Sequence, residues 1–312
     1  MKRIAFLFPG QGAQEVGMGR ELLGRDPFTD ELFARACSES GVDVSGACLK
    51  GPAKVLAETR VLQPAVTAFS LSLLARLEDA GVRPDVVAGH SLGEIPALSA
   101  AGMCDPLDAV SLAVERGRLM SEAAAGRDGA MIAVTGLTVA LVFDAVESMR
   151  GAGAISAGAV NAPTQVTVSG DRAMVDKAAE LLGKRPGAKV VRLNVSGAWH
   201  SEHMRSCVEP FGQALAQTPL VPARVPVVLN RDGGEAIEPD EVRSALFGQL
   251  VSPVRFDLVM ERLVGMEVTD FVEIGPGKVL RGLVRLNHPD PSVSVWNVSD
   301  LRSLERAAEA LA

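Results

Sequence analysis

The chain of 312 residues has 47% hydrophobic and 22% charged side chains, which is enough apolar material to bury a sizeable core. Its 31 basic and 38 acidic side chains leave a net charge of −7, which argues against nucleic acid as a partner. The apolar stretch at residues 4–8 is too short for a secretion signal, and no apolar run approaches the ~20 residues of a membrane span. We therefore expect a cytoplasmic protein that does not contact a membrane. The four cysteines are scattered without a Cys-x-x-Cys pair, so no metal site is expected.

The first part of the chain predicts alternating strands and helices. Residues 3–8 predict a buried strand that ends in a glycine loop, and helical patterns then continue to about residue 80. A second strand at 85–88 leads into a glycine-rich turn and a helix over 94–101. Asp105 as N-cap and Pro106 at the first helical position predict another helix.

Residues 129–194 predict a small inserted domain. Its pattern is βαββαβ, which is typical of a ferredoxin-like domain, with Asn161-Ala162-Pro163 as the turn between the middle strands. Beyond residue 194, strands and helices alternate again, as in a mostly parallel sheet. The fold class is therefore α/β, with a large domain formed by 1–128 and 195–312 and split around a small domain of 129–194. The expected strands of the insert are 131–135, 154–160, 165–169 and 188–193, and those that follow lie near 225–229, 268–274 and 292–298.

Gly89-His90-Ser91-Leu92-Gly93 fits the G-x-S-x-G nucleophile elbow. Its glycines permit a cramped turn that lifts the serine above the sheet and leaves the next backbone N–H free for an oxyanion. The preceding strand and following helix are the context of an α/β-hydrolase-like large domain. Ser91 is thus the candidate nucleophile; a plain turn serine is the alternative.

The base must be one of four histidines. His90 adjoins the serine on a sharp turn, which favours a structural or supporting role. His203 falls in an expected helix, and His288 in an expected exposed loop. His200 lies in a non-periodic stretch where the insert rejoins the main domain, so it is the candidate base, although spacing alone leaves a structural role open.

Arg116 shares a helix face with apolar residues, whereas Arg118 shares one with acidic residues. Arg116 is therefore expected to face inward, where its guanidinium needs an anion or several acceptors. Helical phase leaves two partners open: a structural carboxylate, or a carboxylate on the substrate.

Together these motifs resemble the malonyl-CoA:acyl carrier protein transacylase family, which includes acyltransferase domains of fatty acid and polyketide synthases. The resemblance spans nearly the whole chain. It rests on ordered motifs: Phe8-Pro9-Gly10-Gln11-Gly12-Ala13-Gln14, Gly89-His90-Ser91-Leu92-Gly93-Glu94, Glu115-Arg116-Gly117, Asn161-Ala162-Pro163, Val195-Ser196-Gly197-Ala198-Trp199-His200-Ser201, Gln249 with Pro253-Val254, and Glu273-Ile274-Gly275-Pro276-Gly277.

The resemblance implies that Ser91 carries the malonyl group, that His200 is its base and that Arg116 binds the free carboxylate of malonate. A malonyl group would pass from CoA to the serine and then to the phosphopantetheine thiol of an acyl carrier protein, with ping-pong kinetics. The phosphopantetheine belongs to the carrier, so no cofactor or metal of the enzyme's own is expected. Oligomeric state stays open, with a monomer favoured.

The resemblance further implies that the backbone N–H groups of Gln11 and Leu92 hold the oxyanion and that the main-chain carbonyl of Gln249 orients His200. Trp199 and His90 are expected in the substrate pocket. Trp199 departs from the phenylalanine usual in malonyl-specific relatives. It should still crowd an α-methyl branch; simple core packing is the alternative.

Other readings of the same residues remain. An acyl-thioester hydrolase shares the serine elbow but has no use for an inward Arg116, and a trans-acting polyketide acyltransferase could use another extender unit. A dinucleotide-binding fold lacks the third glycine, because Glu15 stands there. A non-catalytic carrier-binding subunit would require a degenerate site. Two clusters could attract CoA phosphates or an acidic carrier, or be solvated surface: Lys184, Arg185, Lys189 and Arg192, and Lys278, Arg281 and Arg285.

Overall fold

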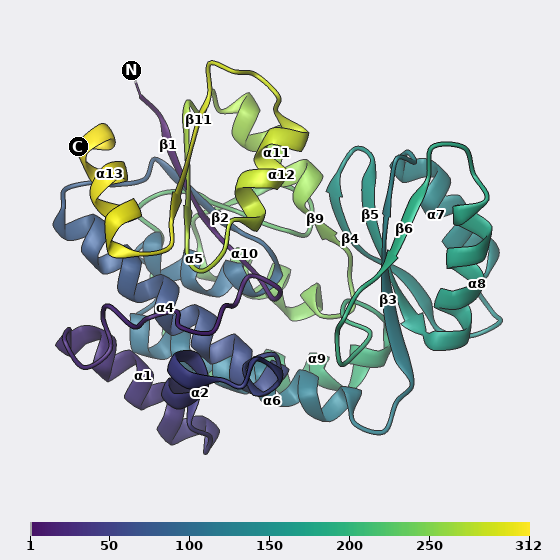
Figure 1. Cartoon of the computed structure of the whole chain (residues 1–312), viewed down its shortest axis with the longest axis horizontal. Coiled ribbons are helices and arrows are strands. Elements are labelled where there is room, and N and C mark those ends of the chain that lie inside the picture. Colours follow the sequence, from purple (N-terminus) through teal and green to yellow (C-terminus); the bar gives the residue numbers. More distant parts are fainter. Residues whose placement is uncertain (1) are drawn as a thin grey trace.

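The computed structural model describes residues 2–312 and contains two β-sheets that lie side by side (Figure 1). Met1, the first residue of the predicted large domain, lies outside the described residues. Both termini lie beside the larger sheet, away from the smaller one (Figure 1). The mixed α/β prediction is confirmed. Over residues 2–312, no helix combines the length and the apolar character needed to cross a bilayer.

The larger sheet has six strands in the order β11-β10-β1-β2-β7-β8. All neighbouring pairs are parallel except β7 with β8, so the expected mostly parallel sheet is present. Its strands are β1 (Ile4–Phe8), β2 (Val86–Gly89), β7 (Val227–Val228), β8 (Glu235–Ala236), β10 (Asp270–Ile274) and β11 (Ser294–Val298).

Helices cover both faces of this sheet (Figure 1). The helices outside the insert are α1 (Pro27–Ser40), α2 (Val44–Lys50), α3 (Ala53–Leu56), α4 (Thr59–Asp79), α5 (Glu94–Ala100), α6 (Pro106–Ala124), α9 (Val208–Gln217), α10 (Pro239–Gln249), α11 (Phe256–Gly265), α12 (Val279–Asn287) and α13 (Leu301–Leu311), with the 3-10 helices η1 (Ser91–Gly93) and η2 (Glu202–Cys207). The expected start of α6 is confirmed: the Asp105 carboxylate accepts from the Leu107 N–H at 2.8 Å, and Pro106 is the first helical residue.

Strand β1 shows why its run of apolar residues is continuous. Every residue of the strand is buried. Phe6 and Phe8 join the core that includes residues of α1, α4 and α6, whereas Ala5 and Leu7 join the core that includes residues of α11 and α12. A parallel strand covered on both faces needs apolar side chains at every position, because successive side chains point to opposite faces.

The smaller sheet has the order β6-β3-β5-β4-β9. The helices α7 (Val139–Ser148) and α8 (Arg172–Gly183) lie on its side away from the larger sheet (Figure 1) and enclose a separate core. Its strands are β3 (Gly129–Thr135), β4 (Ile155–Ala162), β5 (Gln165–Asp171), β6 (Lys189–Arg192) and β9 (Val254–Arg255). The turn prediction needs a correction: Asn161 and Ala162 are the last residues of β4, and the turn consists of Pro163 and Thr164.

Strand β9 was not predicted. It comes from the chain after α10 and pairs in parallel with β4, with Ala159 opposite Val254. The smaller sheet is therefore completed by a segment that begins 62 residues after β6, the last of its other strands along the chain.

Candidate active site

The turn that carries Ser91 is built by close backbone contacts. A Cβ atom added at Gly89 would lie 1.9 Å from the carbonyl carbon of Gly93, and one at Gly93 would lie 2.0 Å from the Phe8 oxygen. Neither position can hold a larger residue without moving the backbone. Ser91 follows with a left-handed φ of 54°, a conformation that side chains other than glycine rarely adopt.

Ser91 and His200 are in direct contact. The Ser91 Oγ lies 2.7 Å from His200 Nε2, and His200 Nδ1 lies 3.0 Å from the main-chain oxygen of Gln249. A carbonyl only accepts, so Nδ1 carries the proton and Nε2 presents its lone pair to the serine. Among the hydrogen bonds of residues 2–312, none joins His200 to a carboxylate.

The surroundings of His200 keep its imidazole neutral. Its side chain is 6% exposed, and burial together with the nearby Arg116 charge lowers its pKa to about 3. Its φ of 57° is also left-handed. A neutral imidazole at physiological pH can accept the serine proton, which suits the predicted base.

Arg116 lies on the inner face of α6 and is 1% exposed, as expected. Its Nη2 lies 3.1 Å from Ser91 Oγ and 2.7 Å from Gln249 Oε1, and its Nη1 donates to Gln63 Oε1 at 2.9 Å. Its Nε has no partner within residues 2–312. Of the two partners left open by helical phase, a structural carboxylate is not found: no ion pair of the described chain includes Arg116. Burial lowers its pKa to about 10, so it stays charged at neutral pH.

These groups open into a cavity of about 300 Å³ between the two sheets. The other candidates, Gln11, Leu92, His90 and Trp199, also line it. The His90 Nε2 lies 2.8 Å from Asn161 Oδ1, and burial lowers the pKa of the ring. All predicted site residues are thus brought together; the oxyanion, pocket and base roles stay predictions.

Four polar residues of the site were not predicted as site residues from the sequence. Gln63 contacts Arg116, and Asn161 contacts His90. Asn230 Oδ1 accepts from the Ser91 N–H at 2.6 Å, and Glu94 accepts from the Asn230 N–H at 2.7 Å. Two of the four carry a sequence signal: Gln63 interrupts the apolar run at 61–66, and Asn230 follows the carboxyl end of β7, where parallel sheets place their sites.

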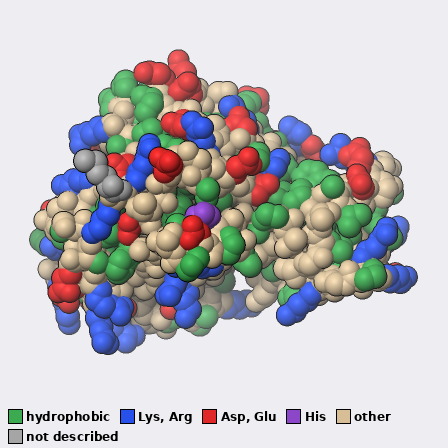
Figure 2. Space-filling view, turned by 90° about the horizontal axis from the view of Figure 1, so that it is seen from above, with side chains coloured by type: hydrophobic (Ala, Val, Ile, Leu, Met, Phe, Trp, Pro, Cys, Tyr) green, Lys and Arg blue, Asp and Glu red, His purple; other side chains and the backbone are tan. Residues whose placement is uncertain are grey.

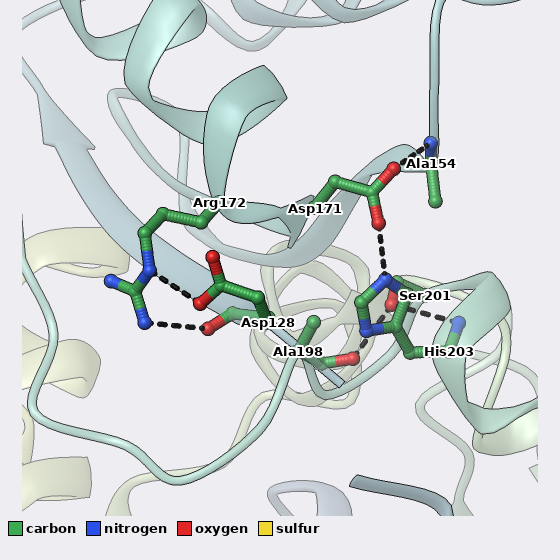
Figure 3. A network of polar contacts seen from close by, with 8 residues as sticks. Asp128, Ala154, Asp171, Arg172, Ala198, Ser201 and His203 are labelled. Carbon is green, nitrogen blue, oxygen red and sulfur yellow. Dashed lines mark hydrogen bonds and ion pairs between the residues drawn. The ribbon is translucent and has the colours of Figure 1, made fainter. Parts of the chain in front are cut away.

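The segment after His200 is held to the smaller sheet (Figure 3). Ser201 Oγ accepts from the His203 N–H at 3.3 Å, and His203 Nε2 lies 2.7 Å from Asp171 Oδ1 at the end of β5. The other carboxylate oxygen of Asp171 accepts from the Ala154 N–H at 2.8 Å. The His203 and Ala154 bonds lower the pKa of Asp171. The base candidate is thus anchored to α10 through its ring and to the smaller sheet three residues later.

Basic and acidic side chains are intermixed over the face drawn in Figure 2. In the two clusters singled out from the sequence, Lys184 pairs with Glu180 at 2.6 Å and Arg192 pairs with Asp176. Arg285 donates to the main-chain oxygens of Asp290 and Val293. Some basic side chains of both clusters are therefore engaged in ion pairs or hydrogen bonds within the chain.

Known proteins resemble this chain over its full length. Residues 5–292 match the acyl transferase domain family. A malonyl CoA-acyl carrier protein transacylase of Bacillus subtilis is 36% identical over 313 residues, covering 100% of this chain and 98% of that protein. The crystal structure of a malonyl-CoA:acyl carrier protein transacylase from Xanthomonas oryzae superimposes with a TM-score of 0.93 at 34% identity, covering 100% and 99%. A malonyl-transacylase in complex with its type II PKS acyl-carrier protein gives 0.92 at 32% identity, covering 99% and 100%.

Proposed function

Because the chain belongs to the acyl transferase family, we propose that it transfers a malonyl group from malonyl-CoA to the phosphopantetheine thiol of an acyl carrier protein. The observation that carries this function is the position of Arg116, whose Nη2 lies 3.1 Å from Ser91 Oγ. A buried cation with only neutral partners beside the nucleophile suits a substrate that brings its own carboxylate. A plain acyl-thioester hydrolase would need no such group.

The proposed reaction uses the serine and histidine twice. His200 Nε2 takes the Ser91 proton as Oγ attacks the malonyl thioester carbonyl, and the C–S bond then breaks. The imidazolium returns the proton to the departing CoA sulfur, which leaves a malonyl ester on the serine. The carrier thiol gives its proton to His200 and attacks the ester, and the proton returns to Ser91 as the malonyl carrier is released.

The supporting roles follow the same proposal. The N–H groups of Gln11 and Leu92 would hold the oxyanion, the Gln249 carbonyl would fix the imidazole tautomer, and Trp199 and His90 would shape the pocket. One thioester is exchanged for another, so no cofactor, metal or nucleotide is required of this chain. A cytoplasmic location and a monomeric state stay predictions.

We also propose the domain division given by the sequence, with an α/β-hydrolase-like domain of 1–128 and 195–312 and a ferredoxin-like domain of 129–194. The order β6-β3-β5-β4 together with two helices supports the second. The elbow between β2 and α5 supports the first.

The test is intact mass of the protein after brief incubation with malonyl-CoA or acetyl-CoA, followed by a phosphopantetheinylated carrier protein. We expect a malonyl adduct that is absent in Ser91→Ala and that moves to the carrier. An adduct lost to water before the carrier is charged would identify a hydrolase. Absence of an adduct with malonyl-CoA would point to a different acyl group, as in a trans-acting polyketide acyltransferase with another extender unit.

A further inference from the structure

A buried carboxylate that the proposed reaction does not use lies beneath the site. Glu94 is the first residue of α5 and is 2% exposed. Its Oε1 accepts from the Asn230 N–H at 2.7 Å, and its Oε2 accepts from Gln249 Nε2. Among the ion pairs of residues 2–312 none includes Glu94, so amides alone satisfy it.

Through Asn230 this carboxylate reaches the backbone of the nucleophile. The Asn230 Oδ1 accepts from the Ser91 N–H at 2.6 Å, and its Nδ2 donates to the Gly89 carbonyl at 2.6 Å. The two bonds hold the backbone of the elbow at Gly89 and at Ser91, the residues before and after His90. Ser91 has a left-handed φ, which persists only where neighbouring contacts hold it.

Through Gln249 the same carboxylate reaches the arginine. Gln249 Nε2 donates to Glu94 and, at 3.0 Å, to the Ser91 carbonyl, while Gln249 Oε1 accepts from Arg116 Nη2 at 2.7 Å. A carboxylate and a carbonyl only accept, so they force the amide nitrogen inward and the amide oxygen toward the guanidinium. Glu94 and the Ser91 carbonyl together therefore orient the Gln249 side chain, whose oxygen is one of the groups that hold Arg116.

The charges of this network are also arranged for an incoming anion. The buried guanidinium touches only neutral oxygens, and the carboxylate whose charge acts most strongly on it, Glu94, lies behind the Gln249 amide. Burial raises the pKa of Glu94 to about 7, while hydrogen bonds and Arg116 oppose that rise. In slightly alkaline buffer the carboxylate form dominates, and it offsets the Arg116 charge without occupying the place of a substrate carboxylate.

We propose that Glu94 is a positioning residue for malonyl selectivity: it fixes the Gln249 amide so that Arg116 presents its guanidinium to the free carboxylate of the substrate. This inference rests on the proposed function. Two carboxylates then have different roles. The substrate carboxylate contacts Arg116 directly, whereas the Glu94 carboxylate orients Arg116 through the Gln249 amide.

The test compares acylation of Ser91 by malonyl-CoA and by acetyl-CoA at pH 8 in the wild type and in Glu94→Gln, from the rate of thiol release. The variant is isosteric, but its amide has one oxygen where the carboxylate has two. The Asn230 N–H belongs to the backbone and cannot turn away, so the oxygen stays with Asn230 and the NH2 group faces Gln249, which loses one of the two acceptors that orient its amide. We expect the malonyl-to-acetyl ratio of kcat/KM to fall about tenfold or more, because buried hydrogen-bond partners are mismatched. An equal loss with both substrates would overturn the proposal, since it would mean that Glu94 only holds the elbow.

Glu273 provides the matched control. It is a fully buried carboxylate on β10 that accepts from the Leu280 and Arg281 N–H groups, and burial raises its pKa as well. Glu273→Gln should leave the malonyl-to-acetyl ratio within about twofold of the wild type, because the described hydrogen bonds of Glu273 include none to Arg116, Gln249 or Asn230, and residues that share no partners usually act independently. A comparable loss of the ratio in this control would overturn the specific role of Glu94.

A second variant covers the case in which Glu94→Gln does not fold. The exchange Glu94→Gln/Gln249→Glu keeps one amide facing one carboxylate, but it places the carboxylate directly against Arg116 and removes the donor to the Ser91 carbonyl. We expect this protein to fold and to lose malonyl selectivity, because the substrate carboxylate is displaced; recovery of wild-type selectivity would overturn the proposal. A wild-type protein that malonyl-CoA does not acylate would instead refute the proposed function itself, before any variant is compared.

Discussion

Replacing Arg116 by methionine tests the substrate carboxylate directly. Methionine keeps much of the buried volume but removes the cation next to Ser91, whose Oγ lies 3.1 Å from Nη2. For two unit charges about 4 Å apart at an effective dielectric constant of about 20, the Coulomb energy is about 4 kcal/mol. Because about 1.4 kcal/mol corresponds to a tenfold change in rate, kcat/KM for malonyl-CoA should fall by about a thousandfold.

The same substitution should affect acetyl-CoA far less, because acetyl has no carboxylate to lose. The assay is thiol release with each acyl-CoA, together with intact mass of the acylated enzyme. Arg118→Met is the matched control: Arg118 lies on the same helix, is exposed, and pairs with Glu115 and Glu122. A malonyl rate that falls less than tenfold in Arg116→Met, or that falls equally with acetyl-CoA, would refute the carboxylate role.

Three further predictions concern the pocket, the anchor of the histidine segment and pH. Trp199→Phe should raise methylmalonyl-CoA use relative to malonyl-CoA by up to about tenfold, since excluding one methyl group is worth about 1–3 kcal/mol; an unchanged ratio in paired kcat/KM measurements would leave Trp199 as core packing. Asp171→Asn should lower kcat more than KM by weakening the His203 anchor, and an unchanged kcat would show that the anchor is dispensable. The pKa of His200 is depressed from 6.5 to about 3, so its contribution to stability is complete above 6.5 and is lost as pH falls toward 3. Between pH 7 and pH 5 the free energy of unfolding should therefore drop by about 2 kcal/mol more in the wild type than in His200→Gln, measured by urea titration, and equal slopes would contradict this.

Strong local patterns predicted the elements that carry them. The apolar run of β1, the Asp105-Pro106 start of α6 and the βαββαβ order of residues 129–194 are all present in the structure. Each depends on residues close together in sequence, through burial, capping or periodicity. The same holds for the elbow at Ser91, whose glycines and flanking elements are contiguous.

Features made by distant contacts were not predictable in this way. Strands β8 and β9 have two residues each, too few for any alternation to be recognised, and exist because a partner strand pairs with them. The polar network is similar: Glu94 meets Asn230 and Gln249 from 136 and 155 residues away. The sequence around Glu94 does not show which distant residues will donate hydrogen bonds to its carboxylate. Its role can therefore be inferred only from the folded structure.

The pairing of β4 with β9 bears on any attempt to transplant the smaller sheet into another enzyme. The edge of β4 at Ala159 and Val160 is covered by Val254 and Arg255, which lie outside residues 129–194. A graft limited to 129–194 would expose unpaired N–H and C=O groups along β4, and such edges recruit other chains into aggregates. A chimera that exchanges substrate selectivity should therefore carry residues 254 and 255 along with the insert, so that the exchanged unit is discontinuous in sequence although contiguous in space.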